Sequence, residues 1–202
     1  MNPAPETARS GSASSGEPFL VAVTGASGAV YAAALLKRLR ELGIETHVVL
    51  SAAGEAVAAH EGFPALAELA DRRFANDDLF APCASGTARY RAMAVVPCSM
   101  GTLGRIAHGV SDSLITRAAD VFLKERLRPL VLVPRETPYG LIHVENMATL
   151  VRAGARIVPA SPSFYRRPET IDDLVASVVG KVLEQCGIAD HGLYRPWGEE
   201  ER

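Results

Sequence analysis

The sequence predicts an α/β domain in which helices cover both faces of a mostly parallel β-sheet. Short apolar runs alternate with longer segments of helical periodicity, and this alternation is typical of βαβ units. A glycine-rich turn at 24–28 joins the first apolar run to the first helical segment. Alanine, glycine and valine are abundant while aromatic residues make up 6 %, a composition that lets helices pack closely on a sheet.

The first part of the chain is predicted to contain three strands and three helices. The strands are the apolar runs 19–23, 45–50 and 92–96. The helices are 30–42, a segment capped by Ser51 and ending near Glu61, and 64–73. The stretch 74–91 is polar and rich in turn residues, so no regular element is expected there.

The second part continues the alternation and ends in the clearest helix of the chain. Helices are expected at 114–125 and 144–152, and strands at 130–133 and 156–158. The last helix begins near Thr170, which forms a capping-box pattern with Asp173. Its apolar residues recur at three-and-four spacing, and Lys181 lies at the edge of this stripe.

Composition excludes several classes of protein. The 202 residues are 48 % apolar and 22 % charged, which fits one globular domain and not a disordered chain, a collagen or a coiled coil. The net charge of −2 argues against a nucleic-acid partner. No apolar run reaches the length of roughly 18 residues that spans a membrane. The five histidines form no metal-binding pattern, so no metal site is expected.

The N-terminal segment and the cysteines indicate a compartment. Residues 1–18 lack leucine, isoleucine, valine and phenylalanine and are rich in proline, serine, alanine and glycine, so a disordered segment is expected and a signal peptide is not. The three cysteines, Cys83, Cys98 and Cys186, are scattered and odd in number. This argues for a reducing compartment and a cytoplasmic location.

The turn 24–28, Thr-Gly-Ala-Ser-Gly, is the first candidate binding loop. Its small residues let a ligand approach the backbone, and the following helix N-terminus favours a phosphate. Many α/β proteins use such a turn only for packing, and that interpretation stays open. A short-chain dehydrogenase is disfavoured because Ser51 stands where a nicotinamide enzyme has its ribose-selecting charge. No tyrosine is followed four residues later by the lysine which that family requires.

Three later segments also follow predicted strands. In 97–102, Ser99 and Thr102 are candidates for binding phosphate or ring carbonyls, whereas Cys98 is interpreted as a buried structural thiol. Arg135 ends the strand 130–133 and suits an anionic ligand, with Glu136 beside it as a candidate for proton movement. In 164–168 the tyrosine Tyr165 and two arginines suit a phosphate; an aromatic plug with surface arginines is the alternative.

Six segments together carry a resemblance to one family: 24–29, 97–99, 117–121, 123–126, 129–138 and 164–168. They resemble the UbiX flavin prenyltransferases over about 19–197. The resemblance implies a Rossmann-like (flavodoxin-like) three-layer sandwich, with 19–202 as a single flavoprotein domain. It also implies a homo-oligomer, a homododecamer, with active sites at subunit contacts.

The reaction implied by this resemblance is prenyl transfer to a flavin. A dimethylallyl group from dimethylallyl phosphate joins N5 and C6 of reduced FMN. The product, prenylated FMN, is the cofactor of a partner UbiD-type decarboxylase. The reaction is metal-independent, so protein cations must stabilise the leaving phosphate.

The resemblance assigns roles to individual residues. Catalytic roles fall to Ser27, Glu61, Glu136 and Trp197, whose ring is suited to stabilise an allylic cation. Flavin contacts fall to Gly25, Ala26, Ser27, Ser51, Ser99, Met100, Gly101, Thr102 and Arg135. The substrate phosphate is assigned to Arg117, Lys124, Tyr165 and Lys181.

One departure from the family pattern and two alternative functions remain. The family usually reads Lys-Glu-Arg-Arg-Pro-Leu, whereas here Leu127 separates Arg126 from Arg128. The first alternative is an FMN-dependent decarboxylase of the same superfamily that acts on cysteine-like substrates. Such relatives usually carry a histidine in the first helix and an asparagine-rich loop, and neither 31–42 nor 97–102 has them. The second alternative, a flavin-binding or storage protein, would not need the cations and acids of the substrate subsite.

Overall fold

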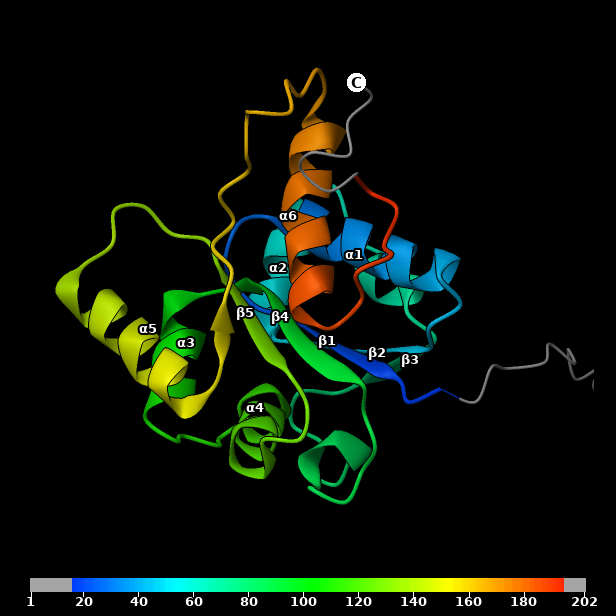
Figure 1. Cartoon of the computed structure of the whole chain (residues 1–202). Coiled ribbons are helices and arrows are strands. Elements are labelled where there is room, and N and C mark those ends of the chain that lie inside the picture. The colour runs from blue at the N-terminus through cyan, green and yellow to red at the C-terminus, as the bar shows by residue number, and fades with distance from the viewer. Residues whose placement is uncertain (1–15, 195–202) are drawn as a thin grey trace, which may run out of the picture.

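A computed structural model describes residues 16–194, and these form a six-stranded sheet covered by helices on both faces (Figure 1). The strand order is β3-β2-β1-β4-β5-β6, and every adjacent pair is parallel. The strands are β1 (Phe19–Val23), β2 (Thr46–Leu50), β3 (Arg72–Phe74), β4 (Ala92–Cys98), β5 (Leu130–Pro134) and β6 (Arg156–Ile157). This is the strand order of Rossmann domains and not the flavodoxin order. The predicted α/β fold, a Rossmann-like three-layer sandwich with a parallel sheet, is confirmed.

The helices divide between the two faces of the sheet (Figure 1). One face carries α1 (Ala29–Glu41), α2 (Ala52–His60) and α6 (Ile171–Gln185). The other carries α3 (Met100–Ala107) and α4 (Leu114–Glu125), and α5 (Leu141–Ala153) packs on the outside of α3. Because the chain passes from β3 back to β4 on the other side of β1, the order reverses between β1 and β4, and ligands of such sheets bind at this point.

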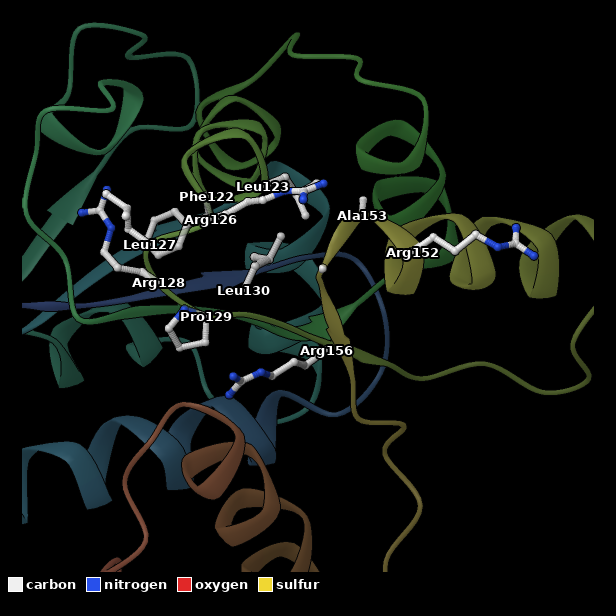
Figure 2. A pocket seen from close by; sticks show the side chains of 11 residues that line it. Phe122, Leu123, Arg126, Leu127, Arg128, Pro129, Leu130, Arg152, Ala153 and Arg156 are labelled. Atoms are coloured by element: carbon white, nitrogen blue, oxygen red, sulfur yellow. The ribbon is translucent and has the colours of Figure 1, made fainter.

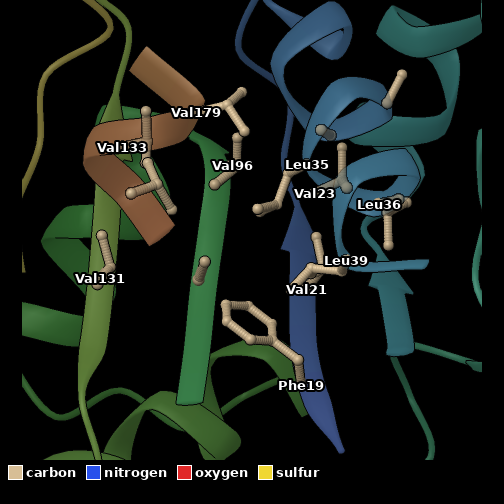
Figure 3. Close-up of a cluster of buried hydrophobic side chains, with 14 of the residues drawn as sticks. Phe19, Val21, Val23, Leu35, Leu36, Leu39, Val96, Val131, Val133 and Val179 are labelled. Atoms are coloured by element: carbon tan, nitrogen blue, oxygen red, sulfur yellow. The ribbon is translucent and has the colours of Figure 1, made fainter. Parts of the chain in front are cut away.

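Side chains of each strand alternate between two apolar layers. Phe19, Val21 and Val23 of β1 face α1 and α6, where Figure 3 shows them beside leucines of α1 and valines of β4 and β5. The residues between them, Leu20 and Ala22, face α3 and α4. All five residues of β1 are buried, as expected for a parallel strand covered on both faces. Burial of one such leucine or valine stabilises the fold by roughly 1.5–3 kcal/mol.

The predicted caps of two helices are confirmed. Ser51 accepts a hydrogen bond from the backbone N–H of Gly54 at 3.0 Å and so begins α2. Thr170 accepts from the N–H of Asp173 at 3.1 Å, and the Asp173 carboxylate accepts from the N–H of Thr170 at 2.9 Å. These reciprocal bonds form the capping box that starts α6.

Two segments differ from the sequence prediction. The predicted helix 64–73 is wrong: this segment forms a 3-10 helix, η1 (Leu66–Leu69), followed by β3. Asp71 accepts from the backbone N–H of Thr46 at 2.7 Å, and this contact holds the segment against β2 so that β3 can pair there. The helix α3 was not expected, because glycines 101 and 104 lower the helical propensity of its sequence. A short 3-10 helix, η2 (Pro82–Ala84), lies in the turn-rich stretch.

The predictions about the ends and the cysteines fall partly outside this structure. Residues 1–15, most of the predicted disordered segment, lie outside the described residues. Cys83, Cys98 and Cys186 are buried and free, and burial raises the pKa of Cys98 to about 12. Over 16–194 no helix is both long enough and apolar enough to cross a membrane.

Candidate active site

The loops that follow β1 and β4 are joined by one buried threonine. Thr24 is 1 % exposed, and its hydroxyl donates to the Pro97 carbonyl at 2.9 Å. The same hydroxyl accepts from the backbone N–H of Ser99 at 2.8 Å. Thr24 therefore holds both loops in register at the point where the strand order reverses. Nothing in the sequence around Thr24 indicates this positioning role.

A cavity of about 350 Å³ lies between these loops, the end of β2 and the start of α4. Gly25, Ser51, Ser99 and Thr102 line it, so four of the predicted flavin-binding residues lie together. Further polar residues line this cavity that the sequence did not single out: Asn76, Arg105, Asp112, Ser113 and Thr116. The side chains of Arg105 and Asp112 form an ion pair at 3.4 Å. These residues could not be identified from the sequence, because none of them stands in a segment that was expected to follow a strand.

Hydroxyl groups and a helix N-terminus make this cavity suitable for a phosphate and a polar ring. Ser99 caps α3, accepting from the N–H of Thr102 at 3.3 Å, and its hydroxyl donates to the Thr102 hydroxyl at 3.0 Å. The first N–H groups of α3 have no partner inside the helix, and they favour an anion. A Cβ on Gly25 would lie 2.6 Å from the Ala53 Cβ, so the close approach of these backbones requires glycine.

The other members of the predicted flavin loops flank this cavity. Ala26 and Met100 are buried, whereas Ser27 and Gly101 are exposed. Arg135, just after β5, donates from Nε to the Ser27 carbonyl at 3.2 Å. Arg135 thus reaches across β4 to the loop after β1, as predicted strand-end neighbours should.

Glu61 holds the N-terminus of α1. One carboxylate oxygen of Glu61 accepts from the N–H of Gly28 at 3.0 Å and from that of Ala29 at 2.7 Å. Burial raises the pKa of this carboxyl, but hydrogen bonds from Ser27, Gly28 and Ala29 and the charge of Arg135 lower it more, so the net pKa is below the ordinary value. The anion that the sequence predicts at this helix N-terminus is therefore supplied by the protein itself. Glu61 is also placed to fix Ser27.

A second cluster contains two of the predicted phosphate ligands. Tyr165 and Lys181 line a cavity of about 240 Å³ with Ser163, Arg166 and Tyr194. A hydrogen bond with Arg166, followed by the charges of Arg166 and Lys181, lowers the pKa of Tyr165 below its usual value. Lys181 pairs with Glu184 one helical turn away. This cluster is cationic and open to a negatively charged group.

The other two predicted phosphate ligands lie elsewhere in the chain. Arg117 donates to the Ala84 carbonyl at 3.1 Å and pairs with Asp120 at 2.9 Å. Lys124 stands in the last turn of α4 beside Glu125, with Nζ and Oε1 3.5 Å apart. That turn leads into the amino end of β5, whereas Tyr165 follows the carboxyl end of β6. One chain therefore does not bring Lys124 to Tyr165 and Lys181.

The remaining predicted site residues are Glu136 and Trp197. Glu136 is exposed next to Arg135 and accepts from the N–H of Thr137 at 2.9 Å. Trp197 lies outside the described residues. Within 16–194 no group of three histidine, cysteine, aspartate or glutamate side chains is arranged to hold a metal ion.

Comparison with known proteins places this arrangement in context. The family profile described as Flavoprotein matches residues 7–183. A protein of Halalkalibacterium halodurans named flavin prenyltransferase UbiX is 45 % identical over 198 residues, covering 90 % of this chain and 94 % of that protein. Its namesake in Deinococcus radiodurans is 47 % identical over 193 residues, covering 94 % of this chain and 98 % of that protein.

Solved structures agree with these sequence matches. The crystal structure of AnUbiX in complex with FMN and dimethylallyl pyrophosphate superposes with a TM-score of 0.86 at 43 % identity, covering 92 % of this chain and 99 % of that chain. A dodecameric FMN-dependent UbiX-like decarboxylase from Escherichia coli gives a TM-score of 0.81 at 47 % identity, covering 84 % and 94 %. Peptidyl-cysteine decarboxylase EpiD, at 16 % identity and a TM-score of 0.56, shares the fold alone.

Proposed function

The chain belongs to the UbiX family of flavin prenyltransferases, and we propose that it joins the dimethylallyl group of dimethylallyl phosphate to N5 and C6 of reduced FMN. The observation that supports this most is the pairing of two sites. One is a hydroxyl-lined cavity at the switch point of the sheet, and the other is a cationic cluster around Tyr165 and Lys181. A flavin site alone would not need the second.

The residues around the first cavity fit a bound FMN. Ser51, Ser99 and Thr102 offer hydroxyl groups, and Gly25 lines the cavity with backbone alone. Ala26, Ser27, Met100, Gly101 and Arg135 complete the set that would hold the flavin ring and its phosphate. Reduced FMN supplies the nucleophilic nitrogen of the reaction.

Cationic side chains stabilise the departing phosphate in this proposal. Tyr165 and Lys181 bind it in one chain, and Arg117 and Lys124 complete the set from a neighbouring copy. Each charge-assisted hydrogen bond of this kind contributes roughly 1.5–3 kcal/mol. Because these contacts strengthen as negative charge develops on the leaving phosphate, they favour the transition state more than the bound substrate.

Acidic and aromatic residues manage protons and the carbocation. Glu61 fixes Ser27 through the hydrogen bond between their side chains, and so sets where the Ser27 hydroxyl meets the flavin. Glu136, exposed beside Arg135, is placed to take the proton released when the second bond closes. The ring of Trp197 stabilises the allylic cation through its π face.

A homo-oligomer, a dodecamer in this proposal, completes the site. The separation of Lys124 from Tyr165 within one chain supports it. The helix α5 supports it as well, since four of its apolar side chains are exposed: Leu141, Ile142, Val144 and Val151. The product is then passed to a UbiD-type decarboxylase, and the protein acts in the cytoplasm as the single domain 19–202.

Phosphate release tests this function against its alternatives. The protein, reduced FMN and dimethylallyl phosphate are incubated without oxygen and without magnesium, and inorganic phosphate is measured. We expect about one phosphate per flavin, and none when FMN is omitted or oxidised. Release independent of the flavin would contradict the proposal. Carbon dioxide release from an aromatic acid or a cysteine peptide by the pure protein would favour the decarboxylase instead.

A further inference from the structure

A cavity of about 280 Å³ at the far end of the sheet from the flavin site is lined by four arginines. Arg126 and Arg128 belong to the loop after α4, Arg152 to the last turn of α5 and Arg156 to the start of β6 (Figure 2). Arg152 extends away from the loop and is exposed, so it stands at the rim. Apolar side chains also line it, among them Phe122, Leu123 and Leu130.

The positive charge of this cavity is not neutralised by residues 16–194. None of the four guanidinium groups forms an ion pair within that range. Arg128 donates to the Ala88 carbonyl and stacks 5.2 Å from the Phe122 ring centroid, and Arg156 donates to the Gln185 carbonyl. The Nε of Arg128 is buried and meets no acceptor among the described residues.

The loop also presents an apolar side chain. Leu127, the residue that interrupts the usual family spacing, is 78 % exposed between Arg126 and Arg128. Arg126 ends α4 in the left-handed region with φ 55°. The surface therefore suits an acidic segment that also offers carbon surface.

The chain itself contains such a segment after the described residues. Glu199, Glu200 and Glu201 follow Trp197 and Gly198 in the sequence. Tyr194, the last described residue, lines the cavity of Tyr165 and Lys181, so the segment departs from the substrate-phosphate cluster. From there the three glutamates can reach at most roughly 17–25 Å along an extended chain.

The position of Lys124 indicates which copy of the chain supplies the arginines. In the proposed function, on which this inference rests, Lys124 of a second copy joins Tyr165 and Lys181. Arg126 and Arg128 follow Lys124 by two and four residues, so in that copy they lie within reach of the glutamates. In the same chain Arg126 and Arg128 lie at the opposite end of the sheet from Tyr165 and Lys181.

We propose that residues 199–201 of one copy bind the arginine cavity of a second copy. The carboxylates accept hydrogen bonds from Arg126, Arg128 and Arg156, and the stems of the glutamates pack on Leu127. The contact ties the segment that carries Trp197 across the subunit boundary. Leu127 thereby provides part of the surface that would hold this segment next to the substrate site of the other copy.

Disulfide trapping tests the contact directly. In the full-length protein, the double variant Leu127→Cys with Glu201→Cys keeps Glu199 and Glu200, and the three native cysteines are buried. Under mild oxidation we expect a covalent link between two chains, seen by non-reducing electrophoresis. The matched control is Leu127→Cys with Glu68→Cys, an exposed glutamate at the other edge of the sheet, and each single variant controls for symmetric pairing.

The charges are tested in the same background. Adding Glu199→Lys and Glu200→Lys should lower the yield of linked chains several-fold, and so should high salt, which screens exposed ion pairs. A yield equal to the control refutes the proposal, and a link formed only within one chain refutes the second copy as occupant. Flavin prenylation by the unmodified protein is assayed separately. If it is absent the proposed function fails, whereas loss of the link with prenylation intact overturns only this inference.

Discussion

Replacing Thr24 by valine should weaken flavin binding although Thr24 contacts no solvent. Its hydroxyl joins the loop after β1 to the loop after β4, donating to Pro97 at 2.9 Å and accepting from Ser99 at 2.8 Å. Valine keeps the shape of the side chain and removes both bonds. The Pro97 carbonyl keeps the N–H of residue 24 at 3.2 Å, but the Ser99 N–H loses its acceptor.

The size of the effect follows from the cost of one unsatisfied buried group. That cost is about 1–3 kcal/mol, so the free energy of unfolding should fall by this amount. For a domain of this size each kcal/mol lowers Tm by roughly 2–4 °C. Because FMN must bind the displaced Ser99 loop, the free energy of FMN binding should weaken by about 1–2 kcal/mol. The FMN dissociation constant should therefore rise about 5–30-fold.

Thr46→Val is the matched control. Thr46 is also fully buried, and its hydroxyl donates to Asp71 at 2.9 Å and accepts from the Asp71 N–H at 3.2 Å, but at the amino end of β2. Thermal unfolding without flavin and titration by flavin fluorescence are measured for both variants. Both should be destabilised, and only Thr24→Val should bind FMN more weakly. Equal FMN affinities in the two variants would refute the argument that Thr24 positions the flavin loops.

Three further outcomes are expected. Because the pKa of Glu61 is lowered in the folded state, the stabilisation from its carboxylate is fully present above its ordinary pKa of about 4.3 and is lost as pH falls through the lower folded pKa. In denaturant titrations, the free energy of unfolding of Glu61→Gln should therefore depend less on pH in the acid range. Lys181→Ala should lower kcat/KM for the prenyl donor about 10–100-fold while FMN affinity stays constant, whereas Lys37→Ala, exposed on α1, should change neither; equal losses for donor and flavin would show that the two subsites are not separate. Gly25→Ala should weaken FMN binding because the new Cβ would lie 2.6 Å from the Ala53 Cβ, and calorimetry showing unchanged affinity would contradict this.

Elements with a strong periodic signal were predictable from the sequence. The apolar stripe and capping box of α6 and the buried run of β1 needed no tertiary information. β3 was not predictable, since three residues with one buried side chain carry no strand signal and form a strand only by pairing with β2. The helix α3 was hidden by its two glycines, and a Cβ on Gly104 would lie 3.3 Å from the Asn146 side chain of α5, so the packing of these two helices favours glycine there.

Some residues of the candidate site were also predictable from the sequence, and others were not. Strand-end loops identified Gly25, Ser51, Ser99 and Thr102, because parallel strands bring their carboxyl ends together. Thr24 was missed because its role depends on a carbonyl 73 residues away. Lys124 and Tyr165 are separated because Lys124 precedes the amino end of β5 and Tyr165 follows the carboxyl end of β6, and motif matching carries no such information.

The mass of the flavin after incubation shows whether the protein attaches a prenyl group to it. The protein is incubated with reduced FMN and dimethylallyl phosphate without oxygen or magnesium, and the flavin is extracted and weighed by mass spectrometry. We predict a flavin heavier than FMN by one five-carbon unit. Recovery of unmodified FMN with both dimethylallyl phosphate and dimethylallyl pyrophosphate would show that the protein does not prenylate its flavin.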